Sequence, residues 1–383
     1  MNRISRRDFV VGAAALSLAG QRGLSFAGTV ESGRLLLIGT QTAGSSRGIY
    51  AYSFESETGE LKSLGLAAEA ENPTFLALAP NGRTVLVANE LDTYEGKSSG
   101  AVSTYSLDHA KLSKISEVAS LGGGPCHVAF DHTGRVAFAA NYGGGSAASF
   151  TVGAGGRLGP AVSFLQYSGH GPDPERQKGP HAHRVTVSPD NRFLLVNDLG
   201  LDVIHVYRLD VATAELIQNE PPVWRSSPGA GPRALQFHPN GKFAYCVTEM
   251  ASGLVVLRWD AARGALDTVQ EVGMRPPDFK GVTGGSDLVI DRETRFAYAA
   301  DRFDDIIVTL AISPDGGRLT VLNRTSCGGK VPRHLAFDPS GRWLLVANQL
   351  SDNIAVFRRD LKTGQLATGS SFALSKPQCL AFA

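Results

Sequence analysis

A small set of residues in this sequence has side chains that can bind an anion and transfer a proton. Arginine holds a carboxylate or phosphate through forked hydrogen bonds, and an imidazole or carboxylate can act as a general acid or base. We expect His183, Glu249, Arg233 and Arg302 to be catalytic, and Arg333, His181, Glu90 and Tyr142 to bind the substrate. A ring of structural salt bridges is the alternative, but the arginines of this set outnumber its carboxylates.

Two histidines of the set raise the question of a metal ion. His181 and His183 are two residues apart, so on a strand their imidazoles share one face and could reach the same ion. No third histidine or carboxylate stands at a recognisable ligand spacing. We therefore expect neither a metal nor another cofactor at this site.

The elements that must position these residues form a repeat: two short apolar strands joined by a polar turn. Its six copies are NPTFLALAPNGRTVLVANE, GPCHVAFDHTGRVAFAANY, HAHRVTVSPDNRFLLVNDL, GPRALQFHPNGKFAYCVTE, GGSDLVIDRETRFAYAADR and VPRHLAFDPSGRWLLVANQ. They align without a gap when one column holds Thr74, Cys126, His183, Arg233, Ser286 and Arg333, which places successive copies 47 to 57 residues apart. A period of this length is typical of a four-stranded propeller blade.

The chain ends supply a seventh copy in two halves. The C-terminal KPQCLAFA matches the first strand of the repeat, and GRLLLIGTQ at residues 33–41 matches the second. Pairing these halves would close the ring without an exposed sheet edge. The sequence thus predicts an all-β fold, a single seven-bladed β-propeller over residues 28–383 that is closed by N- and C-terminal strands in one blade.

Two columns of the repeat lie at the same end of each predicted hairpin, because their residues are equidistant from the turn. The first column contains Thr74, Cys126, His183, Arg233, Ser286, Arg333 and Gln378, and the second contains Gln41, Glu90, Tyr142, Leu199, Glu249, Arg302 and Gln349. All these ends should gather at one mouth of the central channel, which unites the candidate residues. The residue before the second column is Thr, Asn or Asp in every copy, and we expect it to bond strand-end backbone.

One copy of the repeat is lengthened by a Pro-rich, charged segment, His170 to Pro180 (HGPDPERQKGP). We expect it to form a loop over the mouth. It is either a lid or an ordinary surface loop.

Residues 1–27 have the features of an export signal: arginines at positions 3, 6 and 7, the apolar run VVGAAALSLAG, and small residues near Ala27. SRRDFV at residues 5–10 resembles the twin-arginine motif, with chance arginines in an ordinary basic region as the alternative. The apolar run is too short to span a bilayer. We therefore expect a periplasmic or extracytoplasmic protein that is exported by a twin-arginine-type signal.

The composition excludes several other classes. Lys and Arg number 37 against 36 Asp and Glu, which argues against a nucleic-acid-binding surface. A hydrophobic content of 43% argues against disorder. The four cysteines have no metal-ligand spacing and are too few for a disulfide scaffold. We expect a monomer without a nucleic-acid or membrane partner.

The sequence resembles the seven-bladed propeller lactonases, the 6-phosphogluconolactonase family that also includes a fungal carboxymuconate-lactonising enzyme. The resemblance is carried by NYGGGS at Asn141, PHAH at Pro180, GPRALQFHPNGKFAY at Gly231 and VPRHLAFDPSGRWLLVANQLSDNIAVF at Val331. It implies a histidine, two arginines and a glutamate at the mouth, at positions similar to His183, Arg233, Arg302 and Glu249. Ala234 and Phe303 depart from the residues usual in the family beside this site.

The resemblance and the anion-binding set together predict hydrolysis of a small anionic lactone of the sugar-acid type. A muconate-type lactonising cycloisomerase is one alternative. A non-catalytic propeller that binds a ligand or protein is the other.

Overall fold

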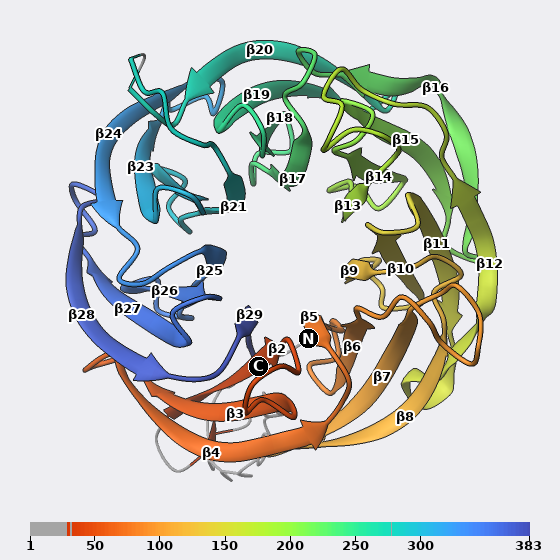
Figure 1. Ribbon diagram of the computed structural model, residues 1–383, viewed down its shortest axis with the longest axis horizontal. Coiled ribbons are helices and arrows are strands. Elements are labelled where there is room, and N and C mark those ends of the chain that lie inside the picture. Colours follow the sequence, from red (N-terminus) through yellow and green to blue (C-terminus); the bar gives the residue numbers. More distant parts are fainter. Residues whose placement is uncertain (1–28, 31–32, 277) are drawn as a thin grey trace, which may run out of the picture.

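The computed structural model describes residues 29–30, 33–276 and 278–383, so that the expected export signal at residues 1–27 lies outside the described residues. The described residues form seven antiparallel sheets arranged in a ring (Figure 1). Each sheet is one blade, with its first strand of the repeat nearest the ring axis. The predicted seven-bladed β-propeller is confirmed.

The strands fall into four concentric positions. The innermost strands are β5 (Pro73–Leu78), β9 (Pro125–Phe130), β13 (Ala182–Val187), β17 (Pro232–Phe237), β21 (Gly285–Ile290), β25 (Pro332–Phe337) and β29 (Pro377–Phe382). The second strands are β6 (Thr84–Asn89), β10 (Val136–Asn141), β14 (Phe193–Asp198), β18 (Phe243–Thr248), β22 (Phe296–Asp301), β26 (Trp343–Asn348) and β2 (Gly33–Thr40). The third strands are β7 (Ala101–Asp108), β11 (Ser146–Val152), β15 (Val203–Asp210), β19 (Gly253–Asp260), β23 (Ile306–Ile312), β27 (Asn353–Arg359) and β3 (Gly48–Glu55). The outer strands are β8 (Lys111–Ala119), β12 (Leu158–Gln166), β16 (Glu215–Arg225), β20 (Ala265–Gly273), β24 (Leu319–Ser326), β28 (Leu366–Ala373) and β4 (Glu60–Glu69).

Strands from both ends of the described chain close the ring in one blade. The C-terminal β29 pairs with β2 in antiparallel register, with Leu36 opposite Phe382 and Ile38 opposite Leu380. A short strand, β1 (Thr29–Val30), also pairs with β2, and the 3-10 turn η1 (Ala154–Gly156) precedes β12. The predicted split blade is therefore confirmed.

The apolar alternation of the strands explains how neighbouring blades adhere. Successive side chains of a strand point to opposite faces of the sheet. In β18, Ala244 and Cys246 pack toward the blade before, and Tyr245 and Val247 pack toward the blade after. A buried apolar cluster of this kind fills each of the seven interfaces between blades. Each blade is thus held rigidly by two neighbours.

A β-bulge recurs at the inner end of every blade and was not predicted. In each blade the pairing between the innermost and the second strand skips the first-column residue, so that the innermost strand has one residue more than its partner at this point. For example, Pro232 pairs with Thr248 and Ala234 with Val247, which leaves Arg233 unpaired between them. A bulge re-aims the side chain of its extra residue. The first column therefore stands apart from the ladder at one end of the ring.

The second column directly follows each second strand and is fixed by backbone. Its amide donates to the carbonyl two residues before the first column in all seven blades, as Glu249 N does to Gly231 O at 2.8 Å. The polar residue before it bonds loop backbone as predicted; Asn89 Nδ2 donates to Glu71 O, and Asp198 Oδ1 accepts from His181 N. Both columns are thus set by the hairpin itself.

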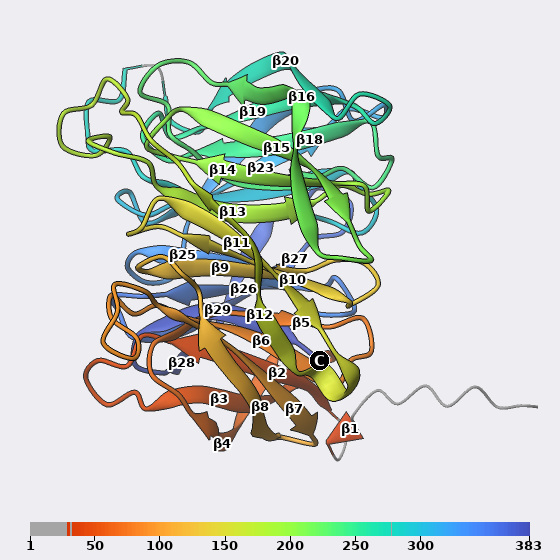
Figure 2. The same ribbon diagram turned by 90° about the vertical axis from the view of Figure 1, so that its right-hand side faces the viewer.

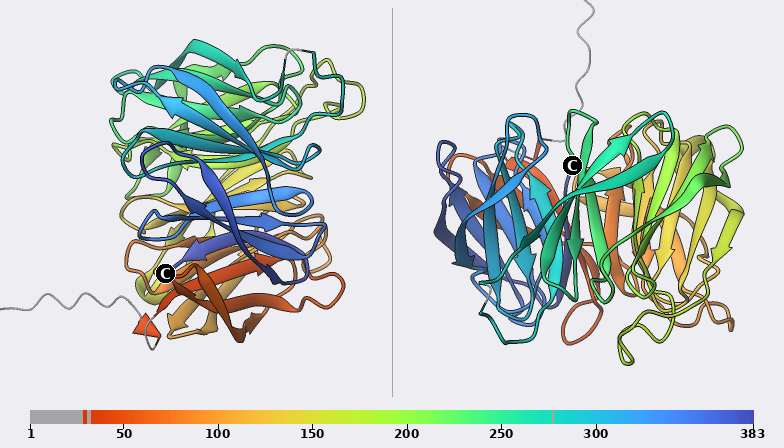
Figure 3. Two further views of the ribbon diagram at one scale, coloured as in Figure 1. Left: turned by 90° about the vertical axis from the view of Figure 1, so that its left-hand side faces the viewer. Right: turned by 90° about the horizontal axis from the view of Figure 1, so that it is seen from above.

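Side views show which face carries the longer connections. The yellow-green connection between β12 and β13 and the orange connection between β6 and β7 project from the same face of the ring (Figures 2 and 3). The predicted loop at residues 170–180 belongs to the first of these. Among the described residues, no helix is long and apolar enough to cross a membrane.

Candidate active site

A cavity of about 320 Å³ lies where the two columns meet the projecting loops. It is lined by Glu90, Cys126, Tyr142, Arg176, His183, Glu249, Arg302, Phe303 and Arg333. Six of the eight predicted site residues are in this lining. Arg233 lines a narrower adjoining cavity, which shares His183 and Arg333 with the first. His181 lines neither cavity.

Glu249 is the centre of the site and is surrounded by three guanidinium groups. Its carboxylate is 3.0 Å from Arg233 Nε and 2.8 Å from a terminal nitrogen of Arg302, and it also pairs with Arg176. The Glu249 side chain is only 3% exposed. A buried carboxylate needs such partners because an unpaired buried charge is costly.

The electrostatics of Glu249 follow from this arrangement. Burial alone would raise the pKa of Glu249, but Arg302, Arg233 and Arg176 outweigh it and lower the pKa to about 2. Glu249 is therefore ionised at every pH at which the protein would work. With its oxygens engaged by cations, it is well placed to hold the arginines and poorly placed to take up a proton.

His183 has the opposite character. Burial and the nearby guanidiniums, Arg233 first among them, lower the pKa of His183 well below the usual 6.5. The imidazole is therefore neutral at pH 7. Within the described residues neither of its ring nitrogens has a hydrogen-bond partner, although the ring lines the cavity and meets Tyr142 edge-on at 5.7 Å. A neutral, unbonded imidazole in a cavity can accept a proton from water.

Two further charged residues line the cavity with free side chains. Among the described residues, neither the Arg333 guanidinium nor the Glu90 carboxylate has an ion-pair or hydrogen-bond partner. Arg333 occupies the bulge at the start of β25, and Glu90 follows β6. Both side chains are available to a ligand.

Tyr142 is held in the cavity wall by His181. The two rings are stacked with centroids 4.5 Å apart, and His181 Nδ1 lies 3.0 Å from Tyr142 O. This contact assigns the proton to Nδ1, where it donates to the carbonyl. The structure thus places His181 against the tyrosine, where it orients a lining residue.

Asp301, the residue before Arg302, fixes the turn that orients the Arg302 side chain. Asp301 is fully buried, and its Oδ1 accepts the backbone N–H of Phe303 at 2.9 Å. Arg275 pairs with the same carboxylate, with Nε 3.1 Å from Oδ2. This fixed turn directs Arg302 toward Glu249 and leaves Phe303, which is 51% exposed, at the rim of the cavity.

Comparison with known families decides what kind of protein carries this site. A family model described as a seven-bladed β-propeller lactonase matches residues 35–382. The chain belongs to the seven-bladed β-propeller lactonase family. This lactonase is accordingly a lactone-hydrolysing enzyme.

Individual relatives match the lactonase over most of their own length. The 6-phosphogluconolactonase of Bacillus subtilis is 32% identical over 348 residues, which cover 90% of this chain and 97% of that protein. The 6-phosphogluconolactonase of Formosa agariphila is 30% identical over 326 residues, 83% of this chain and 90% of that one. The structure of the periplasmic gluconolactonase of Pseudomonas aeruginosa superposes with a TM-score of 0.86 at 36% identity, covering 91% of this chain and 98% of that one.

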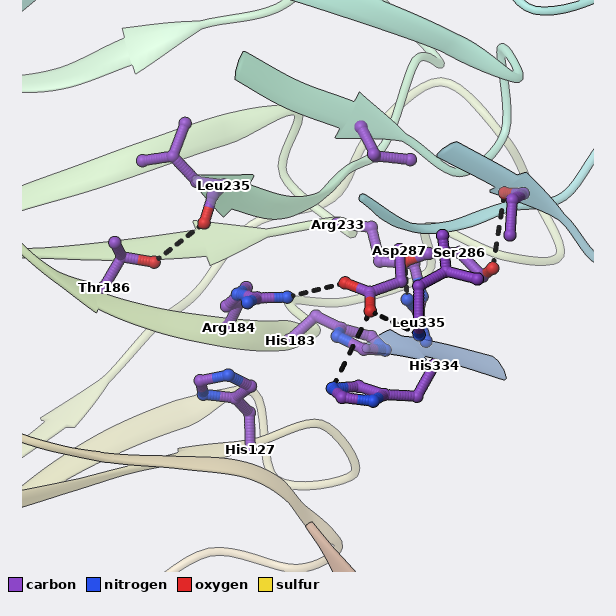
Figure 4. Close-up of polar contacts among 12 residues, drawn as sticks. His127, His183, Arg184, Thr186, Arg233, Leu235, Ser286, Asp287, His334 and Leu335 are labelled. Carbon is purple, nitrogen blue, oxygen red and sulfur yellow. Dashed lines mark hydrogen bonds and ion pairs between the residues drawn. The ribbon is translucent and has the colours of Figure 1, made fainter. Parts of the chain in front are cut away.

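A second polar layer forms the floor of the lactonase site (Figure 4). Asp287, whose side chain is 4% exposed, accepts from Arg184 at 3.0 Å and from Leu335 N at 3.1 Å. His334 Nε2 lies 3.7 Å from the same carboxylate. His127 contacts the ring of Phe75 in a tilted arrangement, with centroids 4.1 Å apart. These side chains, with Arg233 and His183, line the narrow adjoining cavity of about 20 Å³.

Sequence reasoning missed five polar residues of the lactonase site, four in the floor and one in the loop 170–180. Arg184 and Asp287 stand one position after the first column, where His127 and His334 also stand in other copies. The position after the first column is polar in four copies of the repeat and apolar in the others, and this pattern was a signal that could have revealed the floor of the site. Arg176 lies within the loop 170–180, outside the repeat, and no column could have pointed to it. No group of three or more possible metal ligands occurs within the described residues.

Proposed function

We propose that this lactonase hydrolyses a small anionic lactone of the sugar-acid type. The observation that carries the proposal is the excess of cationic over anionic side chains around the two cavities. The cations are Arg176, Arg233, Arg302 and Arg333, and the carboxylates above the floor are Glu90 and Glu249. An anionic substrate would supply the missing negative charge. Relatives named 6-phosphogluconolactonase support a sugar acid, and the family favours hydrolysis over the cycloisomerase and non-catalytic alternatives.

In the proposed mechanism His183 is the general base. Its neutral imidazole takes a proton from water as the water oxygen attacks the lactone carbonyl. The resulting imidazolium then returns that proton to the ring oxygen as the acyl–oxygen bond breaks. One water is consumed and one hydroxy acid is formed, so no further acid is required.

The arginines stabilise the charge that develops on the carbonyl oxygen. Preorganised donors in a buried site lower the barrier because they need no reorganisation as the tetrahedral intermediate forms. Arg302 and Arg233 are preorganised by Glu249, which keeps its negative charge throughout. Arg333, Glu90 and Tyr142 would contact the hydroxyl and anionic groups of the substrate, while His181 acts through Tyr142.

We also infer an extracytoplasmic location and a monomeric state. The features of residues 1–27 support export, as does the 36% identity to a protein described as periplasmic. Because 6-phosphogluconolactone is formed in the cytosol, an exported enzyme would act on another sugar-acid lactone. Cell fractionation with an antibody tests the location, and light scattering after size-exclusion chromatography tests the monomer.

A pH-stat assay against a panel of lactones tests the reaction after subtraction of spontaneous hydrolysis. We expect His183→Asn to reduce kcat by about 10²- to 10⁴-fold, as for loss of a general base. The matched control is His109→Asn, at an exposed imidazole that belongs to neither cavity lining. Wild-type turnover by His183→Asn, or no lactone turnover by the wild type, would overturn the proposal.

A further inference from the structure

The loop between β12 and β13 carries Arg176 on a fixed backbone. Gln177 is fully buried, and its Nε2 donates to Leu199 O and to Asp202 Oδ1, both at 2.9 Å. Its Oε1 accepts from Asp173 N at 3.1 Å, and Asp173 Oδ1 accepts from Arg176 N at 2.8 Å. The loop is therefore anchored on both sides of Arg176. The backbone at residue 176 stays in place when the side chain moves.

The Arg176 side chain is the outermost of the three that contact Glu249. It is 39% exposed, whereas Arg233 is 4% and Arg302 is 13% exposed. Its terminal nitrogen lies 3.5 Å from the Tyr142 hydroxyl and contacts Glu249 Oε1. Arg176 thus lines the cavity and is the most exposed of the three arginines that contact Glu249.

The contact of Arg176 with Glu249 is redundant, because Arg302 contacts the same Oε1 at 2.8 Å and Arg233 holds Oε2 at 3.0 Å. Glu249 would keep a cation on each oxygen after Arg176 leaves. Arg233 and Arg302, in contrast, are packed in the interior. Of the three guanidiniums, only that of Arg176 can be exchanged at low cost.

We propose that Arg176 is the residue by which the enzyme recognises an anionic group on its substrate away from the lactone ring. A phosphate or carboxylate entering the cavity replaces Glu249 as the partner of Arg176 and forms forked hydrogen bonds with it. Arg333, which has no partner among the described residues and lines the same cavity, supplies a second guanidinium. A neutral lactone offers nothing to either arginine.

The change of partner of Arg176 also alters the ion pairs of Glu249, and this effect rests on the proposed function. Arg176 is one of the three cations that lower the pKa of Glu249. When Arg176 turns to the substrate, the remaining attraction of Glu249 is directed to Arg233 and Arg302, the two arginines that face the reacting carbonyl. Binding of the distal charge thereby tightens the catalytic pair.

Ligand binding tests this assignment without relying on turnover. Isothermal titration compares D-gluconate, 6-phosphogluconate and glucarate on the wild type and on Arg176→Gln. We expect the wild type to bind one of the two ligands that carry a second anionic group at least about 10-fold more tightly than gluconate, as for one charged hydrogen bond. Arg176→Gln should abolish that preference, and Arg176→Lys should restore part of it. The ligand with the larger preference distinguishes phosphate from carboxylate.

The matched control is Lys178→Gln, which removes a cation from the same loop. Lys178 is 69% exposed, pairs with Glu175 at 3.4 Å and does not line the cavity. It should leave the preference unchanged. A preference retained in Arg176→Gln, equally lost in Lys178→Gln, or absent from the wild type overturns the assignment of Arg176. Loss of the preference only in Arg176→Gln upholds it even if no lactone is hydrolysed, a result that would overturn the proposed function alone.

Discussion

Arg233 Nε lies 3.0 Å from Glu249 Oε2, and the two side chains are only 4% and 3% exposed. Both belong to one hairpin, Arg233 at the bulge of β17 and Glu249 directly after β18. Their pairing is therefore set by backbone hydrogen bonds of a single blade. Arg302 from the next blade and Arg176 from the loop between β12 and β13 complete the cluster at this carboxylate.

Replacement of Glu249 by Gln should reduce both stability and activity. The substitution keeps the shape of the side chain but leaves Arg233 and Arg302 buried without a counter-charge. Breaking a buried ion pair in this way typically costs about 3–5 kcal/mol. Urea denaturation measures the free energy of unfolding, and the lactone assay should show a large loss of kcat/KM because the arginines are no longer oriented.

A surface pair provides the control for this variant. Glu57 pairs with Arg342 at 2.6 Å, but its side chain is 74% exposed. Exposed ion pairs contribute little. Glu57→Gln should therefore leave the urea midpoint unchanged, and a Glu249→Gln protein as stable and active as Glu57→Gln would contradict the role given to the buried cluster.

The pH dependence of activity should report the depressed pKa of His183. The imidazole works as a base only when neutral, and burial together with Arg233 and the other arginines keeps it neutral well below pH 6.5. We expect kcat/KM to be flat from pH 7.5 down through 6.5 and to fall only at lower pH. An acid limb centred at 6.5 or above would contradict the lowered pKa of His183.

Much of this site could be predicted from sequence because it repeats. The sequence locates Arg233 and Glu249 because each occupies a fixed column of the repeated hairpin. The two strands of a hairpin are antiparallel, so residues equidistant from the turn lie at the same end. The bulge that aims Arg233 could not be foreseen, since the gapless repeat aligns equally well with or without an unpaired residue. The pattern nevertheless located the correct end of the strands.

The residues that escaped prediction are placed by contacts that a single hairpin of the repeat does not determine. Arg176 is placed by the burial of its neighbour Gln177 between two turns, a tertiary contact that local sequence does not encode. Asp287 and Arg184 come from different blades and meet only across the ring axis. Contacts between blades depend on the closure of the whole ring, which the sequence predicts in topology but not in atomic detail.

Replacement of Asp287 by Asn should destabilise the floor of the site. Asp287 carries the negative charge that faces Arg184 and His334, and its loss leaves Arg184 without a partner in the narrow cavity. We expect a loss of about 3 kcal/mol in the free energy of unfolding, measured in urea. Asp267→Asn, on the exposed outer strand β20, is the control. A free energy of unfolding that is unchanged in Asp287→Asn would mean that Arg184 finds another partner.

Acid should destabilise the protein before its carboxylates titrate. Three imidazoles, His127, His183 and His334, have pKa values lowered primarily by burial, so the folded protein excludes their protons. The unfolded chain binds those protons below about pH 6.5. Stability is therefore fully present above pH 6.5 and is lost as the pH falls, by about 1.4 kcal/mol per pH unit for each fully titrating imidazole.

Urea denaturation at pH 7.5, 6.5 and 5.5 measures this slope. His127→Gln should remove about a third of it, because one of the three excluded protons no longer exists, although the substitution also lowers stability at every pH. His109→Gln is the matched control, since that imidazole is 83% exposed. A free energy of unfolding that stays constant between pH 7.5 and 5.5 would mean that the folded protein takes up these protons over the same pH range as the unfolded chain, so that burial does not lower the pKa values of the imidazoles. In that case the pKa of His183 would not be depressed either, and the flat pH profile expected for kcat/KM down through pH 6.5 would be lost.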